Sequence, residues 1–258
     1  MVIAALLSAI IWNLLTWWWG LPSSSSHALI GGIIGGVMAG YGYQHLKIEG
    51  IEKIVLFLIA SPIIGGFVAF SIMISLMWIF RRALPSDVTN TFRPLQIVAA
   101  AFMAFSHGTN DAQKAMGIIT VSLLLLPVAY GGMQGGEFVV PLWVKVAAAL
   151  AMALGTSAGG WKIIKTMGTK IVKLQPINGF ASDTGAALTI TTASFFGLPV
   201  STTHVVSGAI MGVGATKRLS AVRWGVARTM IMAWVFTIPI TATLAAVLYM
   251  ILRYVFKF

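Results

Sequence analysis

Two long stretches without charge constrain the fold of this chain most strongly. Residues 54–80 and 229–252 hold no Asp, Glu, Lys or Arg over 27 and 24 positions, and about 20 apolar residues are enough for a helix to cross the hydrocarbon core of a bilayer. Both stretches are therefore expected to span a membrane. Only 9% of the residues are charged, against about 25% in soluble domains. The sequence predicts an all-α, polytopic bundle of transmembrane helices.

The charged residues predict the topology of that bundle. The net charge is +11 and cysteine is absent, which excludes disulfides and thiolate sites. The cations lie in short connections, as the positive-inside rule expects, so nucleic-acid binding is not expected. The connection 83–94 and the basic loop 160–175 should both face the cytoplasm. Between them we expect an outer loop around 127–140 and one crossing by a helix that is broken near Gly108.

One phrase occurs twice, as GLPSSSSHALIGG at residues 20–32 and as GLPVSTTHVVSGA at residues 197–209. A constant offset of 177 residues aligns the two copies and still pairs Pro62 with Pro239, which indicates an internal duplication. The connection after the first copy has balanced charges, whereas residues 217–228 hold four cations and no acid. The copies therefore should have opposite orientations, as in the inverted repeats of secondary transporters.

This duplication suggests a division of the chain into three parts. Residues 1–82 would be the remainder of a first inverted repeat, residues 83–94 a cytoplasmic linker, and residues 95–258 the second repeat.

The repeated phrase also predicts a binding site for an anion. Gly-Leu-Pro should end one helix, and the hydroxyl residues after it can cap the next. The start of a half-helix near the bilayer midplane offers free N–H groups and partial positive charge to an oxyanion. A single serine in a membrane helix is more often a packing contact, but two matched clusters favour ligands: Ser24, Ser25, Ser26, Ser201, Thr202 and Thr203. His27 and His204 either fix helix geometry or contact substrate or a proton.

A third motif, FSHGTNDAQKAMG at residues 105–117, places charge between apolar runs. An ionised aspartate at that depth costs several kcal/mol unless it is paired, so Asp111 is a candidate functional residue. Asn110 and Asp111 can supply oxygen atoms to a small cation. The alternative is an Asp111–Lys114 pair that only neutralises itself.

Together these motifs resemble the inorganic phosphate transporter family of the Pit type, in its bacterial branch. The resemblance rests on GTNDAQKAMG, LQPINGF at 174–180, GLPVSTTHVVSGAIMGVG and SSSSHALIGG, and it covers nearly the whole chain. It implies a phosphate symporter in the inner membrane of a bacterium or archaeon, driven by Na+ or H+. It implies no further cofactor, phosphate carried alone or as a divalent-metal complex, and a candidate homo-oligomer in the lipid bilayer.

The resemblance also implies roles for individual residues. Asn110 and Asp111 would bind phosphate or the coupling ion, with Gly108 and Thr109 in the same motif, and the two hydroxyl clusters would line the phosphate site. Asp183 stands where the family has a glutamate, although helix N-capping explains it equally well. The family carries Gly-x-Asn-Asp in each half, whereas this sequence has it once. We therefore expect about 80 to 100 residues of a full transporter to lie upstream.

Two other classes of function compete with this interpretation. A permease or channel for another oxyanion, such as sulfate, would use the same neutral hydroxyls. An intramembrane hydrolase would need a nucleophile on a recognisable motif and a matched base, which two symmetric Ser/Thr-His phrases do not supply. The sequence therefore favours a transporter over an enzyme.

Overall fold

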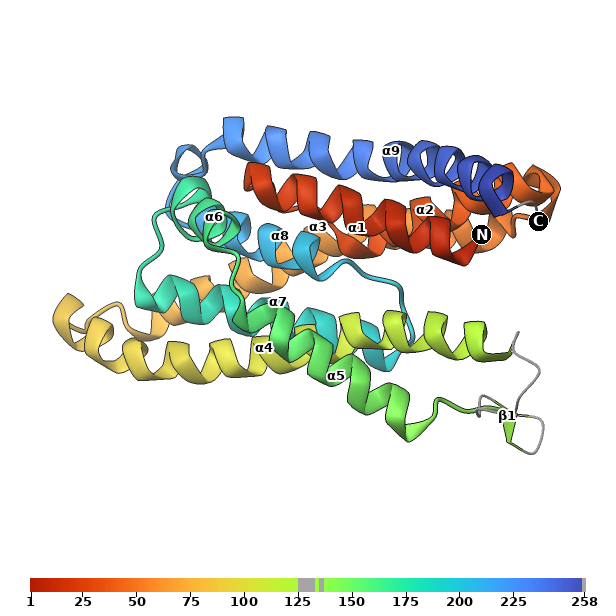
Figure 1. Ribbon diagram of the computed structural model, residues 1–258. Coiled ribbons are helices and arrows are strands. Elements are labelled where there is room, and N and C mark those ends of the chain that lie inside the picture. The colour runs from red at the N-terminus through yellow and green to blue at the C-terminus, as the bar shows by residue number, and fades with distance from the viewer. Residues whose placement is uncertain (125–132, 135–136, 257–258) are drawn as a thin grey trace.

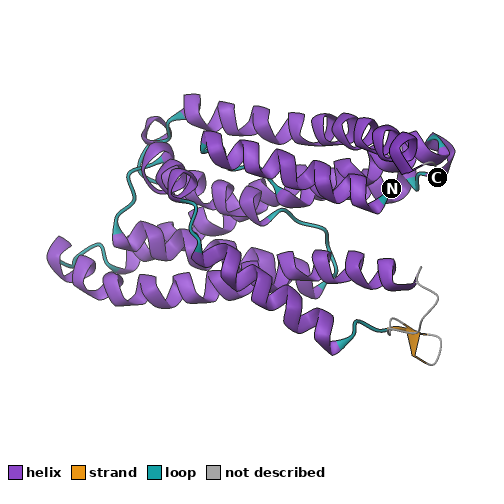
Figure 2. Cartoon of the chain, viewed as in Figure 1, coloured by secondary structure: helices purple, strands orange, loops and turns teal. Residues whose placement is uncertain are grey.

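The computed structural model describes residues 1–124, 133, 134 and 137–256, which form a bundle of helices (Figure 1, Figure 2). The long helices are α1 (Val2–Trp19), α2 (Ser25–Tyr41), α3 (Ile48–Ile79), α4 (Pro85–Leu124), α5 (Leu142–Ser157), α7 (Pro176–Phe195), α8 (Thr202–Ala215) and α9 (Trp224–Phe256). Short elements are η1 (Tyr43–His45), α6 (Trp161–Lys165), the π-helix η2 (Thr166–Ile171), η3 (Leu219–Ala221) and the antiparallel strand pair β1 (Met133–Gln134) and β2 (Glu137–Phe138). The prediction of an all-α bundle is confirmed. Most of the expected outer loop lies outside the described residues.

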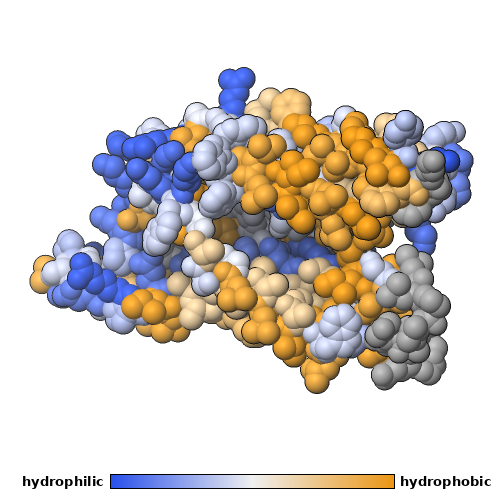
Figure 3. All heavy atoms as spheres, in the orientation of Figure 1, coloured by the Kyte–Doolittle hydropathy of each residue, from blue (hydrophilic) through white to orange (hydrophobic). Residues whose placement is uncertain are grey.

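Helix length and side-chain distribution fit a membrane. Helices α1, α3 and α9 are long and apolar enough to cross a bilayer, and α5 with the segment Trp161–Ile171, bent by 64°, forms a fourth candidate span. Large apolar side chains such as Phe67 and Phe195 point outward, whereas alanines dominate the interior, as expected where close helix packing replaces the hydrophobic effect. Figure 3 shows hydrophobic residues over much of one face, and hydrophilic residues gathered at the end that holds α6.

Each copy of the repeated phrase forms the turn of a helical hairpin. Helix α1 ends at Gly20, whose φ of 69° is left-handed, and α7 is followed by Gly197 with φ 63°. Helix α2 then returns along α1, because Gly32 lies against Ala5 and Gly36 lies against Met1. The predicted helix ends at Gly-Leu-Pro are confirmed, and the glycines are needed because other residues rarely adopt this φ.

The first helix after the repeated phrase in each copy packs against the long helix of the other copy: α2 packs against α9, and α8 packs against α3. A Cβ added at Gly35 would overlap the carbonyl oxygen of Ala242 in α9, and one added at Gly212 would overlap that of Gly66 in α3. Gly35 and Gly212 are partners in the 177-residue alignment. Helices α2 and α8 also run in opposite directions (Figure 1). This is the arrangement expected of an inverted repeat.

Helix α4 differs from the expectation. The predicted linker at 83–94 is helical from Pro85 onward, and the helix continues unbroken through Gly108 to Leu124. The prediction of a break near Gly108 is wrong. A glycine in a helix costs only about 1 kcal/mol, whereas unpaired backbone groups in lipid cost several kcal/mol each, so the continuous helix is favoured. Much of the basic loop 160–175 is likewise helical, in α6 and η2.

Candidate functional site

Ser24 and Ser201 bring the first turns of α2 and α8 together. Ser24 Oγ accepts a hydrogen bond from the backbone N–H of His27, and Ser201 Oγ accepts one from that of His204, each at 3.3 Å. The two caps have almost identical dihedral angles, φ −97° with ψ 117° and φ −97° with ψ 115°. Ser201 Oγ also donates to Ser24 Oγ at 2.9 Å. The predicted caps are confirmed, and they meet where the two repeats join.

This meeting of helix starts has an electrostatic consequence. The first turn of each helix carries partial positive charge, equivalent to about half an elementary charge, and the cap serine satisfies only one of its free N–H groups. Two such ends close to each other repel unless negative charge lies nearby. The junction therefore favours an anion or a carboxylate.

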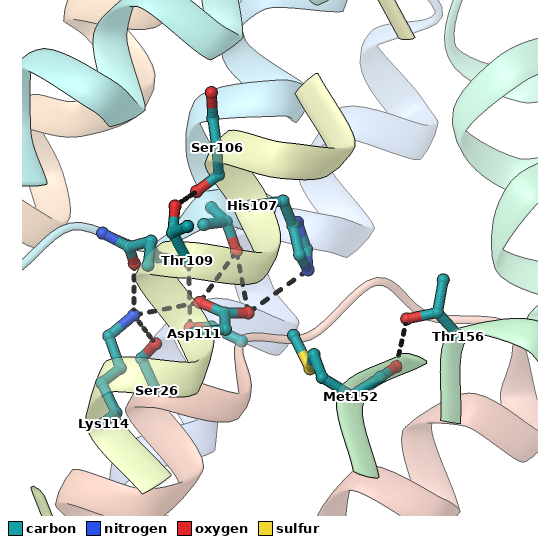
Figure 4. Close-up of polar contacts among 12 residues, drawn as sticks. Ser26, Ser106, His107, Thr109, Asp111, Lys114, Met152 and Thr156 are labelled. Carbon is teal, nitrogen blue, oxygen red and sulfur yellow. Dashed lines mark hydrogen bonds and ion pairs between the residues drawn. The ribbon is translucent and has the colours of Figure 1, made fainter. Parts of the chain in front are cut away.

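Asp111 of α4 supplies that carboxylate. Its side chain is 13% exposed, and Thr202, the first residue of α8, donates its hydroxyl to Asp111 Oδ2 at 3.2 Å. His107 Nε2 lies 3.3 Å from the same oxygen, one turn earlier in α4. Figure 4 shows the ring of His107 directed at this carboxylate. Within the described ranges, no three His, Asp, Glu or Cys side chains group as in a transition-metal site.

Lys114 is the residue whose role the sequence interpretation underestimated. Its ammonium group donates to Ser26 Oγ and Asn110 Oδ1 at 2.7 Å each, to Asp111 Oδ1 at 3.1 Å and to the backbone oxygen of Val200 at 3.2 Å (Figure 4). The expected Asp111–Lys114 pair forms, but it is not isolated. Ser26 belongs to the first repeat and Val200 to the second, so Lys114 links the two.

Asn110 is held in place by the neighbouring helix α7. Its Nδ2 donates to Ser194 Oγ at 2.8 Å, which leaves Oδ1 directed at Lys114. Ser106 and Thr191 share a second hydrogen bond between α4 and α7 at 2.9 Å. The sequence signal for this arrangement is the polar spacing at 106, 110 and 114, which places one face of α4 against the repeats.

His27 and His204 lie at the same junction, with ring centroids 4.5 Å apart. Both are 1% exposed. His204 stacks on Trp234, and its Nδ1 is 3.4 Å from the backbone oxygen of Leu58. Pro62 has no N–H to give to that carbonyl four residues earlier. This contact is of the kind expected if His204 fixes helix geometry, one of the two roles that the sequence left open.

The remaining hydroxyl residues lie around this junction. Ser25 is exposed and, with Ser26, Asp111 and Lys114, lines a pocket of about 340 Å³ between α1, α2 and α4. Thr203 is half-buried in the first turn of α8. Asn13 of α1 is the one further polar residue among those that line the pocket, and the rest are apolar, so these few polar groups determine what it can bind.

Three candidates lie away from the junction. Thr109 donates its hydroxyl to the carbonyl of Phe105, and with Gly108 it lines a separate pocket against α5. Asp183 lies inside α7, which is capped by Gln175, so the N-capping explanation is wrong. It precedes Thr191 by eight residues, about 12 Å along the helix. No described hydrogen bond joins the side chain of Thr109 or Asp183 to Asp111 or Lys114, and Gly108 has no side chain.

Comparison with known proteins agrees with this architecture. Residues 1–245 match the model of the phosphate transporter family. The chain is 49% identical over 258 residues to a probable low-affinity inorganic phosphate transporter of Bacillus subtilis, covering 99% of this chain and 75% of that protein. A protein of the same description from Rhizobium meliloti is 48% identical, with coverage of 96% and 73%.

A solved structure has the same fold. The sodium-dependent phosphate transporter superposes with a TM-score of 0.87 at 26% identity, covering 98% of this chain and 79% of that one. Family and fold both indicate a transporter rather than an enzyme, in the form of a multi-pass protein of the cell membrane. The chain belongs to the phosphate transporter family.

Proposed function

We propose that this chain binds inorganic phosphate at the junction of its two repeats and moves it across the membrane in symport with Na+ or H+. The observation that carries the proposal is the convergence of the α2 and α8 starts, where Ser201 donates to Ser24. The start of α2 lines the pocket that also holds Asp111, and Thr202 at the start of α8 donates its hydroxyl to that carboxylate. Family membership selects phosphate among the oxyanions.

The phosphate ligands we propose are hydroxyl and backbone N–H groups of the two first turns. Ser25, Ser26, Thr202 and Thr203 offer hydroxyls that can rotate to donate or accept. Ser24 and Ser201 serve the site indirectly, because their side chains cap the helices and bond to each other. Neutral donors and helix dipoles suit a transported anion, since it must bind and also leave.

Asp111 is the proposed link to the coupling ion. A carboxylate next to an anion site repels the substrate, unless a cation or proton neutralises it first. Binding of the cation therefore favours binding of phosphate, and by linkage phosphate favours the cation. The same logic holds for Na+ and H+, and for phosphate that moves with a divalent metal.

Uptake into proteoliposomes tests the proposal. Labelled phosphate uptake should saturate, should fall when arsenate competes, and should respond little to sulfate. Replacing Na+ by choline at several pH values separates Na+ coupling from H+ coupling, and omission of divalent cations tests transport of a metal complex. If the protein preferred sulfate over phosphate, the proposed substrate would be wrong and the alternative of a permease for another oxyanion would hold.

The matched variants are Asp111→Asn and Asp87→Asn, two acids on the same helix. Asp87 is exposed in the first turn of α4, so its substitution should leave uptake near the wild-type rate. Asp111→Asn should abolish uptake while insertion into the membrane persists, because it removes the coupling carboxylate. Normal uptake by Asp111→Asn overturns the assignment.

A further inference from the structure

The four contacts of Lys114 have the composition of a cation site. Its ammonium nitrogen has one carboxylate, one amide, one hydroxyl and one backbone carbonyl oxygen within 3.2 Å: Asp111, Asn110, Ser26 and Val200. These are the oxygen donors that hard metal cations take in proteins. An ammonium group has only three hydrogens to donate, so four oxygens around it form a coordination shell rather than a simple ion pair.

The position of the donors supports this description. Val200 lies in the non-helical segment between α7 and α8, and carbonyls of unwound segments coordinate the coupling cations of secondary transporters. Asn110 Oδ1 is aimed at the nitrogen because Nδ2 is bound to Ser194 in α7. The shell thus draws on α2, α4 and the link before α8, and α7 fixes the orientation of one donor.

We propose that Lys114 is a tethered cation, which fills an oxygen site that would otherwise take a free monovalent metal ion such as Na+. The ammonium neutralises Asp111, with which it makes an ion pair at 3.1 Å. The wild-type protein therefore needs no free Na+ at this site, and of the two coupling ions in the proposed function H+ is the one that this site admits. Lys114 determines cation specificity, and the proposal rests on the assignment of Asp111 to ion coupling.

Removal of the side chain gives a direct test without phosphate. Lys114→Ala leaves space and an unpaired carboxylate, which a free cation can neutralise. Its thermal unfolding midpoint in detergent should rise in a saturable way, by about 5 °C at a Na+ concentration of 100 times Kd. The wild-type midpoint should be unaffected. Ionic strength is held constant with choline chloride, because choline is too large for the shell.

Three matched variants separate this proposal from a general effect of lost charge. Lys114→Met removes the charge but fills the space, so Na+ should not stabilise it. Asp111→Asn combined with Lys114→Ala removes the central ligand and should abolish the response to Na+. Lys162→Ala removes an exposed lysine, whose ammonium bonds to the Trp18 carbonyl, and should behave as wild type.

A second measurement covers the case in which Lys114→Ala folds poorly. Methylammonium has the size and charge of the lost lysine end group, so its addition should restore the yield or midpoint of Lys114→Ala, as Na+ does. Neither should act on Lys114→Met. If Lys114→Ala responds to neither cation, or if all variants respond equally, the tethered-cation proposal is wrong. Because no phosphate is present in this experiment, such a failure would not contradict phosphate transport, which the uptake assay tests separately.

Discussion

Ser24 and Ser201 each combine two functions at the residue scale. Each hydroxyl caps its own helix, and the two share a hydrogen bond of 2.9 Å across the repeats. Loss of an N-cap serine costs about 1 kcal/mol. The hydrogen bond between the two serines stabilises the fold by about 1 kcal/mol more, and substitution of either serine removes this stabilisation completely.

A double-mutant cycle should detect this sharing. Ser24→Ala and Ser201→Ala should each lower the free energy of unfolding by about 2 kcal/mol, and the double variant should lose less than the sum, because the same bond is removed twice. Denaturant unfolding in micelles measures it. Ser71→Ala, at an exposed hydroxyl that bonds within α3, is the control and should change little. Strict additivity would mean that the Ser24–Ser201 contact is energetically unimportant.

The sequence predicted the caps but not the contacts between them. Gly-Leu-Pro followed by hydroxyl residues is a local signal, since left-handed glycine and capping serine act within a few residues. The Ser24–Ser201 bond joins residues 177 apart, and no local pattern encodes such a distance. Lys114 was visible as a partner for Asp111, but its contacts to Ser26 and Val200 depend on how α4 docks against both hairpins.

At the scale of elements, close approach between helices depends on paired glycines. Gly35 in α2 faces the Ala242 carbonyl of α9, and Gly212 in α8 faces the Gly66 carbonyl of α3. Any side chain at either position would push the two helices apart. Pairs of this kind hold membrane helices together where apolar surface alone gives no preference over lipid.

Alanine substitutions should therefore affect stability differently at the two packing glycines, Gly35 and Gly212, and at Gly108 in α4. Gly35→Ala and Gly212→Ala should each lower the unfolding free energy by about 1 to 3 kcal/mol through overpacking. Gly108→Ala should be neutral or stabilising by up to about 1 kcal/mol, because no atom other than the neighbouring backbone of α4 lies within 4 Å of the added Cβ. Thermal unfolding and phosphate uptake check both. A Gly108→Ala variant that folds normally but does not transport would show that α4 must bend there during the cycle.

The same helix shows where sequence reasoning fails for an element. A polar motif with glycine inside an apolar stretch suggests a break, as it does at residues 20–24. In α4 the hydroxyls of Ser106 and Thr109 bond to carbonyls within the helix, and Asp111 and Lys114 satisfy each other. The polar side chains are thus accommodated without unwinding the backbone. This outcome depends on neighbours that periodicity does not reveal.

At the scale of the whole molecule, the two ends of the bundle differ in charge. The α2–α3 turn lies at one end with both chain termini, and the α8–α9 turn lies at the other, beside α6 (Figure 1). The α8–α9 turn holds Lys217, Arg218 and Arg223 without an acid, whereas residues 41–53 balance two lysines against two glutamates. By the positive-inside rule we therefore expect the end with α6 to face the cytoplasm.

Single cysteines in this cysteine-free chain test that orientation. Gln44→Cys in η1 and Arg218→Cys before η3 both replace exposed residues, so a membrane-impermeant maleimide should reach each from its own side only. In intact spheroplasts Gln44→Cys should be labelled, and Arg218→Cys should be labelled only after permeabilisation. Arg82→Cys, after α3 at the same end as α6, should follow Arg218→Cys and serves as the internal control. If Gln44→Cys and Arg218→Cys were labelled from one face, the repeats could not be inverted across the bilayer. The starts of α2 and α8 would then not offer a shared anion site that opens to either side in turn.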